Sequence, residues 1–324
     1  MSTRPELLTP AFRALSARLG QDPLQVQGPG GNTSVKDGEV MWIKASGTEL
    51  ADAERKNIFV PVDRTAALAE ARGDAGDGSC KGTVIDAEIG LRPSIETTFH
   101  AALNHPVVVH THSVATLVHA ICPVGRAAAL DKLSGLPFAM VPYAKPGLPL
   151  TKEIMARAEA ATTVFVLENH GLICCGPTVD EVSALVADVE ARLAIPALET
   201  STDLPSANAP TGFAWADEGW LATDPRAFAV ATTGSYYPDH VVFLGPGLPT
   251  VDHEGQPPVV LHRELGAAIR SGATGSQRAM LRCLFDVLKR IPSDWEAEPI
   301  GEAAEAELLN WDAEKYRQAL AARQ

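Results

Sequence analysis

The sequence lacks any long hydrophobic run. None of its stretches approaches the roughly 20 unbroken apolar residues that a membrane-spanning helix needs, and its start, MSTRPELLTPAF, lacks the apolar core of a signal peptide. We therefore expect a cytoplasmic protein with no membrane partner.

Positive charge is also scarce. Lys and Arg number 27 against 40 Asp and Glu in 324 residues, which gives a formal net charge of −13. A surface of that sign repels the phosphate backbone of nucleic acid. The composition therefore argues against DNA or RNA as a partner.

Cysteine pairing is missing as well. The five cysteines are odd in number and show no CxxC spacing, so they indicate neither a disulfide framework nor a thiolate zinc site. A reducing compartment fits this pattern, which agrees with the cytoplasmic expectation.

Local patterns predict alternating helices and strands in the first part of the chain. An amphipathic helix is predicted over 6–20, because apolar residues recur near helical spacing. The Asp-Gly pair at 37–38 predicts a hairpin, because it supplies the positive φ angles of such a turn. Further helices are predicted at 66–73, from Ser94 to about residue 104, and at 178–194.

The rest of the chain is expected to form a second unit. Residues 196–212 are rich in Pro, Ser, Thr and Ala, and are predicted to link a domain of residues 1–195 to a companion domain of residues 213–324. The predicted elements there are strand, turn and strand over 228–247 and closing helices near 276–290 and 303–322. Its expected role is structural support, with a direct contribution to the substrate pocket as the alternative.

Three histidines could hold one metal ion. A strand is predicted over 106–112, and on a strand the i, i+2 pair His110 and His112 points to one face. His170 follows a second buried-looking strand at 163–167. Each histidine alone is explained as well by local packing or hydrogen bonding. Together they predict the open three-histidine sphere in which zinc, or another divalent ion, acts as a Lewis acid.

Glu96 is the candidate acid/base. It is predicted to lie in the first turn of the helix capped by Ser94, where the helix dipole favours a carboxylate. The alternative is a charge that only stabilises the helix. His100, at i+4 from Glu96, either orients that carboxylate or only lies on the same helix face.

Two glycine-containing turns could bind an anion. Gly31-Asn32, in a glycine-rich loop, and Ser46-Gly47, after the hairpin, can present backbone N–H groups and hydroxyls to a phosphate. The loop lacks the Gly-Lys-Ser/Thr sequence of a Walker motif. Turns without any ligand remain the alternative.

These residues, in this order, resemble the class II aldolase/adducin family over roughly residues 8–195. The family's phosphate loop falls on Gly31-Asn32-Thr33-Ser34, its Thr/Ser-Gly turn on Ser46-Gly47, its Ser-x-Glu helix start on Ser94-Ile95-Glu96, and its metal histidines on His110, His112 and His170. The resemblance is to a longer variant of the L-fuculose and L-rhamnulose 1-phosphate aldolases. It implies a three-layer α/β/α fold with a largely antiparallel central sheet, and a smaller C-terminal α/β extension. It also implies zinc, Ser94 among the substrate-binding residues, and a homotetramer with sites between subunits.

The sequence departs from the family pattern at two places. Many phosphate-binding members carry a serine at the position of Ile95, whose side chain cannot hydrogen-bond an oxygen, so the substrate is expected to be either a sugar or a sugar phosphate. Tyr143 lies in the region of a family loop, but no catalytic tyrosine can be assigned.

The leading hypothesis is a class II aldolase of carbohydrate metabolism. Zinc would stabilise the enediolate formed when a ketose or ketose phosphate undergoes retro-aldol cleavage, and Glu96 would move the proton. The same site would also serve an epimerase, a dehydratase or a decarboxylase of a sugar. A non-catalytic binding module of the adducin type is the alternative outside catalysis.

Overall fold

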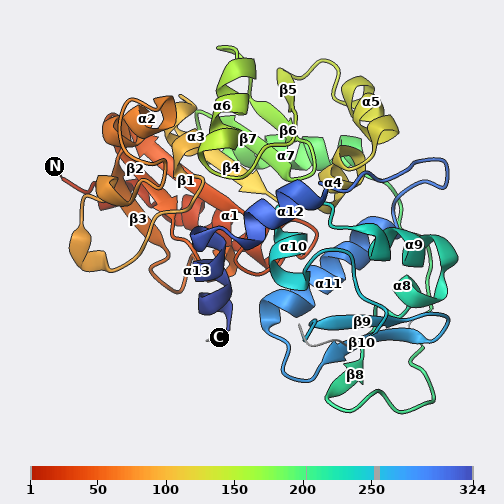
Figure 1. Cartoon of the computed structure of the whole chain (residues 1–324). Coiled ribbons are helices and arrows are strands. Elements are labelled where there is room, and N and C mark those ends of the chain that lie inside the picture. Colours follow the sequence, from red (N-terminus) through yellow and green to blue (C-terminus); the bar gives the residue numbers. More distant parts are fainter. Residues whose placement is uncertain (1, 202, 252–255, 323–324) are drawn as a thin grey trace.

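The computed structural model describes residues 2–201, 203–251 and 256–322 (Figure 1). Its centre is a seven-stranded sheet in the order β3-β2-β1-β4-β7-β6-β5, in which every neighbouring pair is antiparallel except β5 and β6. The strands are β1 (Asn32–Asp37), β2 (Val40–Lys44), β3 (Phe59–Asp63), β4 (Val107–Thr111), β5 (Phe138–Val141), β6 (Val164–Leu167) and β7 (Gly171–Gly176). The predicted α/β fold with a largely antiparallel sheet is confirmed.

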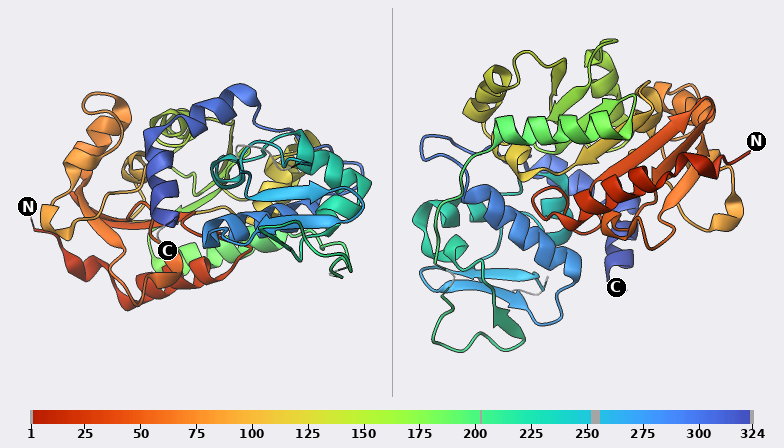
Figure 2. Two further views of the ribbon diagram at one scale, coloured as in Figure 1. Left: turned by 60° about the horizontal axis from the view of Figure 1, so that its bottom comes forward. Right: turned by 180° about the vertical axis from the view of Figure 1, so that it is seen from behind.

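Helices cover both faces of this sheet. The helices on one face are α1 (Pro10–Gln21), α5 (Pro123–Lys132) and α7 (Val179–Leu193), and those on the other face are α2 (Arg64–Arg72), α3 (Thr97–Ala102) and α6 (Leu148–Arg157). Seen from behind, α1 and α7 both lie across the sheet (Figure 2). The molecule therefore has the three layers expected from the sequence.

The register of the sheet brings candidate site residues together. β1 and β4 pair so that Asn32 lies opposite His110, and β4 and β7 pair so that His110 lies opposite Ile173. His170 ends the turn that precedes β7, a strand that the sequence patterns do not predict. The end of β4 is therefore flanked by both neighbouring strands.

Two N-terminal helices differ from their predicted bounds. The opening helix is divided into a 3-10 turn over Pro5–Leu7 and α1, because the Thr9 hydroxyl caps a new helix. Helix α3 begins at Thr97, since the Ser94 hydroxyl accepts the N–H of Glu96 in a tight turn before the helix. Glu96 therefore precedes the helix, and its predicted place in the first turn is wrong.

The strand, turn and strand predicted over 228–247 are also wrong. This segment forms the helices α9 (Pro225–Thr233) and α10 (Pro238–Leu244). Its Val, Thr and aromatic residues favour strands, but a proline at the first position of each helix sets a helical φ. Asp224 also caps α9 by accepting two backbone N–H groups. Helix-start signals outweigh the strand propensity here.

The closing helix predicted over 303–322 is two helices, α12 (Glu302–Leu309) and α13 (Asp312–Ala321). Trp311 between them is extended, with φ −82° and ψ 125°, so the chain changes direction there. Helix α13 then packs on the end of the hairpin, where a Cβ added to Gly47 would lie 2.3 Å from the Leu320 side chain. The close approach of α13 is one reason for a glycine at this position.

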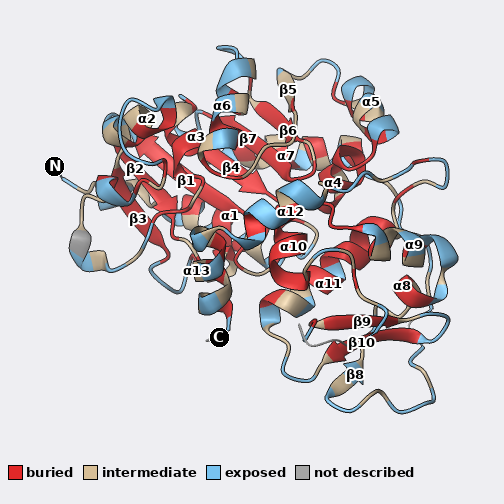
Figure 3. Ribbon diagram, in the orientation of Figure 1, coloured by how far each residue is buried: buried red, intermediate tan, exposed pale blue. Residues whose placement is uncertain are grey.

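The C-terminal part contains a small antiparallel sheet in the order β8-β10-β9. Its remaining elements are β8 (Phe213–Trp215), α8 (Trp220–Thr223), β9 (Val259–His262), β10 (Gly266–Arg270) and α11 (Gly275–Leu288). Val114, Leu117 and Val118 of α4 (Val114–Ala120) are buried in one apolar cluster with residues of α10 and α11. The ribbons of α10 and α11 are largely buried (Figure 3). The assignment of residues 213–324 to a separate companion domain stays a prediction.

No helix within the described residues is long and apolar enough to cross a membrane.

Candidate metal centre

Three histidines converge at the end of β4. His110 is in β4, His112 follows it, and His170 lies in the turn between β6 and β7. One ring nitrogen of each lies within 4.8 Å of the others, and all three side chains are buried. The structure thus brings together the three histidines that the sequence singles out.

Hydrogen bonds determine which nitrogens face the centre. The Nδ1–H of His110 donates to the Leu172 carbonyl at 2.9 Å, which leaves its Nε2 as the atom with a free lone pair. Nδ1 of His112 lies 3.3 Å from Asp239 Oδ2, so we assign the proton of that ring to Nδ1 as well. These tautomers follow from the partners of each ring.

The unpartnered atoms of the site fit a bound cation. Nε2 of His110 and Oε1 of Glu96 are buried without a hydrogen-bond partner in the described chain, and Nε2 of His170 lies 3.3 Å from that Oε1. Buried polar atoms without partners are costly. Burial also lowers the pKa of His170 to about 3, so that the ring is neutral near pH 7. Neutral imidazoles beside a carboxylate are a donor set suited to zinc.

Glu96 is held beside the histidines by a chain of buried polar groups. Its Oε2 accepts a hydrogen bond of 2.8 Å from Asn32 Nδ2, and the Asn32 carbonyl accepts from His100 Nε2–H. The His100 Nδ1 in turn accepts from the Ser34 hydroxyl at 2.7 Å. His100 thus orients Glu96 indirectly, through Asn32.

The carboxylate of Glu96 lies close to two of the histidines, with Oε1 3.3 Å from His170 Nε2 and Oε2 3.5 Å from His110 Nε2. Burial by itself would raise the pKa of Glu96, but the nearby imidazoles and the Asn32 hydrogen bond lower it below the ordinary value. The group is therefore ionised near neutral pH. An ionised carboxylate at this distance can accept a proton from a molecule bound at the histidines.

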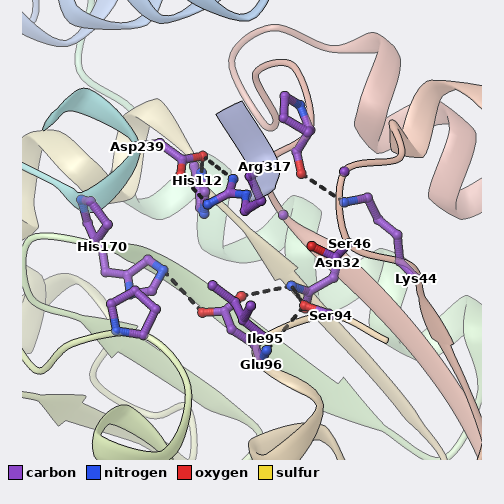
Figure 4. Close-up of a pocket in the computed structure, with 15 residues that line it drawn as sticks. Asn32, Lys44, Ser46, Ser94, Ile95, Glu96, His112, His170, Asp239 and Arg317 are labelled. Carbon is purple, nitrogen blue, oxygen red and sulfur yellow. Dashed lines mark hydrogen bonds and ion pairs between the residues drawn. The ribbon is translucent and has the colours of Figure 1, made fainter. Parts of the chain in front are cut away.

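Two charged residues of the C-terminal part complete the site, and the sequence interpretation assigned neither of them to it. Arg317 of α13 pairs with Asp239, from Nη1 to Oδ1 at 2.9 Å and from Nη2 to Oδ2 at 3.1 Å. Asp239 of α10 then faces His112 (Figure 4). Burial opposes ionisation of Asp239, but the charge of Arg317 holds its pKa well below the usual range.

The sequence carried only a weak signal for these two residues. Asp239 belongs to a polar cluster at 236–240, which the sequence explains equally well as a ligand site or as a turn that enters a strand. In the structure, Asp239 lies in the first turn of α10. Arg317 occupies an ordinary helical position, so nothing local distinguishes it from a solvent-exposed arginine.

The residues predicted to bind substrate line a pocket beside the histidines. They are Gly31, Asn32, Ser46, Gly47 and Ser94, together with Glu96, His112 and His170. Both polar atoms of the Asn32 side chain are already engaged within the protein. Its function as a substrate ligand stays a prediction.

Two further side chains near the pocket have defined surroundings. Lys44 lines it and donates to the Pro29 carbonyl at 2.8 Å, and burial lowers the pKa of this lysine to about 7. Tyr143 is not among the lining residues, and its buried hydroxyl has no hydrogen-bond partner among the described residues. No catalytic role is assigned to Tyr143.

The chain matches known proteins over part of its length. The family model of the class II aldolase and adducin N-terminal domain matches residues 13–195. The uncharacterized oxidoreductase YuxG of Bacillus subtilis is 34% identical over 176 residues, which are 49% of this chain and 25% of that protein. The match therefore spans about a quarter of the length of this curated relative.

Solved structures also resemble part of the chain. The N-terminal class II aldolase domain of a conserved protein from Thermoplasma acidophilum is 28% identical, with a TM-score of 0.50, over 56% of this chain and 89% of that chain. L-fuculose 1-phosphate aldolase from Glaciozyma antarctica is 15% identical, with a TM-score of 0.40, over 59% of this chain and 73% of that chain.

Proposed function

The chain belongs to the class II aldolase and adducin family, and on that premise we propose that it is a zinc-dependent aldolase that cleaves a ketose or a ketose phosphate. The observation that carries the proposal is the convergence of three buried histidines, with ring nitrogens within 4.8 Å of one another, beside the buried carboxylate of Glu96. A family member that only binds a partner does not need three metal-binding histidines and a carboxylate at one place.

Each polar residue around the histidines has a role in this proposal. A zinc ion held by His110, His112 and His170 would supply Lewis-acid chemistry, polarising the carbonyl of a sugar. Glu96 would accept a proton from the carbon next to that carbonyl in the condensation direction, and would return it in the cleavage direction. Asp239 would keep the Nδ1–H tautomer of His112, and Asn32 would hold the Glu96 carboxylate in place.

The cellular setting and the assembly belong to the same proposal. The described cysteines are all free and buried, which suits a reducing cytoplasm. A homotetramer is proposed from the resemblance to the family. Size-exclusion chromatography with light scattering tests the assembly directly.

Metal analysis and product analysis test the enzyme proposal. We expect stoichiometric zinc in the purified protein. We expect His112→Ala and His170→Ala each to lose both the bound zinc and the turnover. His105→Ala is the matched control, because His105 is only partly buried and its Nε2 contacts the Thr162 carbonyl, away from the centre. Zinc and turnover retained in both site variants would refute the proposal.

A substrate panel separates cleavage from the other reactions of the same site. Incubation with ketose phosphates and free ketoses is expected to yield three-carbon or two-carbon products. Products that all keep the carbon count of the substrate would exclude cleavage and favour epimerisation or dehydration. Loss of a single carbon as CO₂ would indicate a decarboxylase.

A further inference from the structure

A second, larger cavity adjoins the metal centre. Its volume is about 620 Å³, and it shares Ser46, Ile95 and Pro146 with the inner pocket beside the histidines. The inner pocket has a volume of only about 30 Å³, which is room for on the order of two water molecules. A sugar is therefore larger than the inner pocket, and the outer cavity adjoins that pocket at Ile95.

The outer cavity collects positive charge in a molecule of net charge −13. Lys81, Arg92 and Lys145 line it, together with the aromatic rings of Trp311 and Tyr316. The Arg92 guanidinium lies 4.0 Å from the centre of the Tyr316 ring. Across residues 2–201, 203–251 and 256–322, the Arg92 side chain has no ion pair or hydrogen bond, so its N–H donors are available to a ligand.

The acidic residues of the same cavity already have partners. Asp77 accepts the backbone N–H of Ser79 at 2.9 Å, and Asp312 pairs with Lys315 at 3.6 Å. Lys145 is 2.7 Å from Glu307 and lies over the Trp311 ring. Among the described residues, Arg92 and Lys81 are therefore the cations of this cavity that have no acidic partner, and only Arg92 offers the planar set of N–H donors of a guanidinium.

The backbone ties Arg92 to the wall between the two cavities. Its carbonyl accepts the N–H of Ser46 at 2.9 Å, and the adjacent Pro93 forms a bridge with Ala45. Arg92 is four residues before Glu96 in the sequence. It lines the outer cavity, and its backbone is bonded to Ser46, which lines both cavities. A guanidinium in this place can contact one end of a molecule whose other end lies at the histidines.

We propose that the outer cavity binds the acidic end of the substrate, a phosphate or a carboxylate, with Arg92 as its main contact and Lys81 as a second cation. Guanidinium groups bind both anions through paired N–H donors, and the Tyr316 ring keeps the guanidinium plane in place. The apolar Ile95 side chain contacts the middle of the substrate. The inference rests on the proposed function and names its substrate class, an acidic sugar derivative.

Anion binding to the zinc-loaded protein tests this inference. The probes are inorganic phosphate and malonate, titrated by calorimetry against wild type, Arg92→Gln and the control Arg72→Gln, which removes an exposed arginine that lines neither cavity. We expect Arg92→Gln to weaken binding of the preferred probe at least about tenfold, and Arg72→Gln to leave it unchanged. The probe that binds wild type more tightly identifies the acidic group.

Equal affinity in wild type and Arg92→Gln, or no binding of either probe to wild type, would overturn the inference. Zinc content is measured in the same samples, so that failure of this inference is distinguished from failure of the proposed function. A protein with full zinc content and anion binding that does not depend on Arg92 refutes only the outer site. A second readout is the ratio of kcat/KM for a ketose phosphate to that for the free ketose. Arg92→Gln is expected to lower this ratio about tenfold if the acidic group is a phosphate.

Discussion

At the candidate metal centre, the ring of His112 faces a carboxylate from a distant part of the chain. Asp239 Oδ2 lies 3.3 Å from His112 Nδ1, and both groups are buried. A carboxylate in this position selects the tautomer of a metal-binding histidine and increases its basicity. In the proposed zinc site, Asp239 would therefore position His112 rather than bind the ion itself.

We expect Asp239→Asn to weaken zinc binding about 10- to 100-fold, because an amide of the same size removes the negative charge behind His112. Competition with a chromogenic zinc chelator measures this affinity. Asp286→Asn is the matched control, since Asp286 is also buried and ion-paired but contacts Arg282 and Lys289 instead of a histidine. Zinc affinity in Asp239→Asn equal to that of the control would contradict the positioning role.

The residues of the site divide into those that local patterns can predict and those that they cannot. His110 and His112 are found by the strand period, and His170 by its place after a second strand, because these signals lie within a few residues of one another. Asp239 contacts His112, and Arg317 contacts Asp239, only through the packing of α10 and α13, for which the sequence carries no local signal. Charged residues on amphipathic helices look alike whether they face solvent or a site.

At the scale of elements, the predicted helices and strands can be compared with those of the structure. A hairpin forms at the predicted place, but Asp37 pairs with Val40, so its two-residue turn is Gly38-Glu39 and only Gly38 has a positive φ, of 58°. The predictions failed at α9 and α10, where residues of high strand propensity follow a proline at each helix start. Strand propensity depends on context, and an isolated stretch of Val and Thr does not reveal whether a sheet is available to receive it.

Helix α13 is anchored by one buried charge cluster. Arg317 contacts Asp239 of α10 and Glu314 of its own helix, the latter at 2.8 Å and 3.0 Å. Burial raises the pKa of Glu314, and Arg317 opposes this shift. Both carboxylates therefore depend on the same guanidinium, and the helix that carries it closes one side of the inner pocket.

Arg317→Met is expected to lower the free energy of unfolding by about 3–5 kcal/mol, because it leaves buried carboxylates without a cation. Urea unfolding followed by circular dichroism provides the measurement. Lys315→Met on the same helix is the control, since its exposed pair with Asp312 should contribute less than about 1 kcal/mol. Equal losses in the two variants would show that Arg317 does not anchor the helix.

On the scale of the whole molecule, residues of the C-terminal part hold the candidate metal centre in place. Asn169, next to His170, has a left-handed backbone with φ 53°. Its side-chain amide donates to the carbonyls of Tyr236 at 3.0 Å and Glu298 at 2.8 Å. The turn that presents His170 is therefore held by two segments of the C-terminal part, in addition to the contact of Asp239 with His112. These contacts are of the kind that a supporting role predicts, and the alternative, a direct contribution to the substrate pocket, also stays a prediction.

Truncation after residue 200 tests this dependence. The shortened chain would expose Leu117, Val118 and Ile121 of the α4 region, which are fully buried against the C-terminal part, and exposed apolar patches of this kind promote aggregation. We therefore expect insoluble protein, measured by the soluble fraction after expression. Any soluble remainder should bind zinc at least about tenfold more weakly than the full chain, because Asp239 no longer orients His112.

A soluble, folded fragment with full zinc affinity would contradict the dependence, since the N-terminal part would then build the metal centre alone. If that fragment also lost turnover, the C-terminal part would act on the substrate rather than on the metal, with Arg317 at the pocket and Tyr316 at the outer cavity as its contacts.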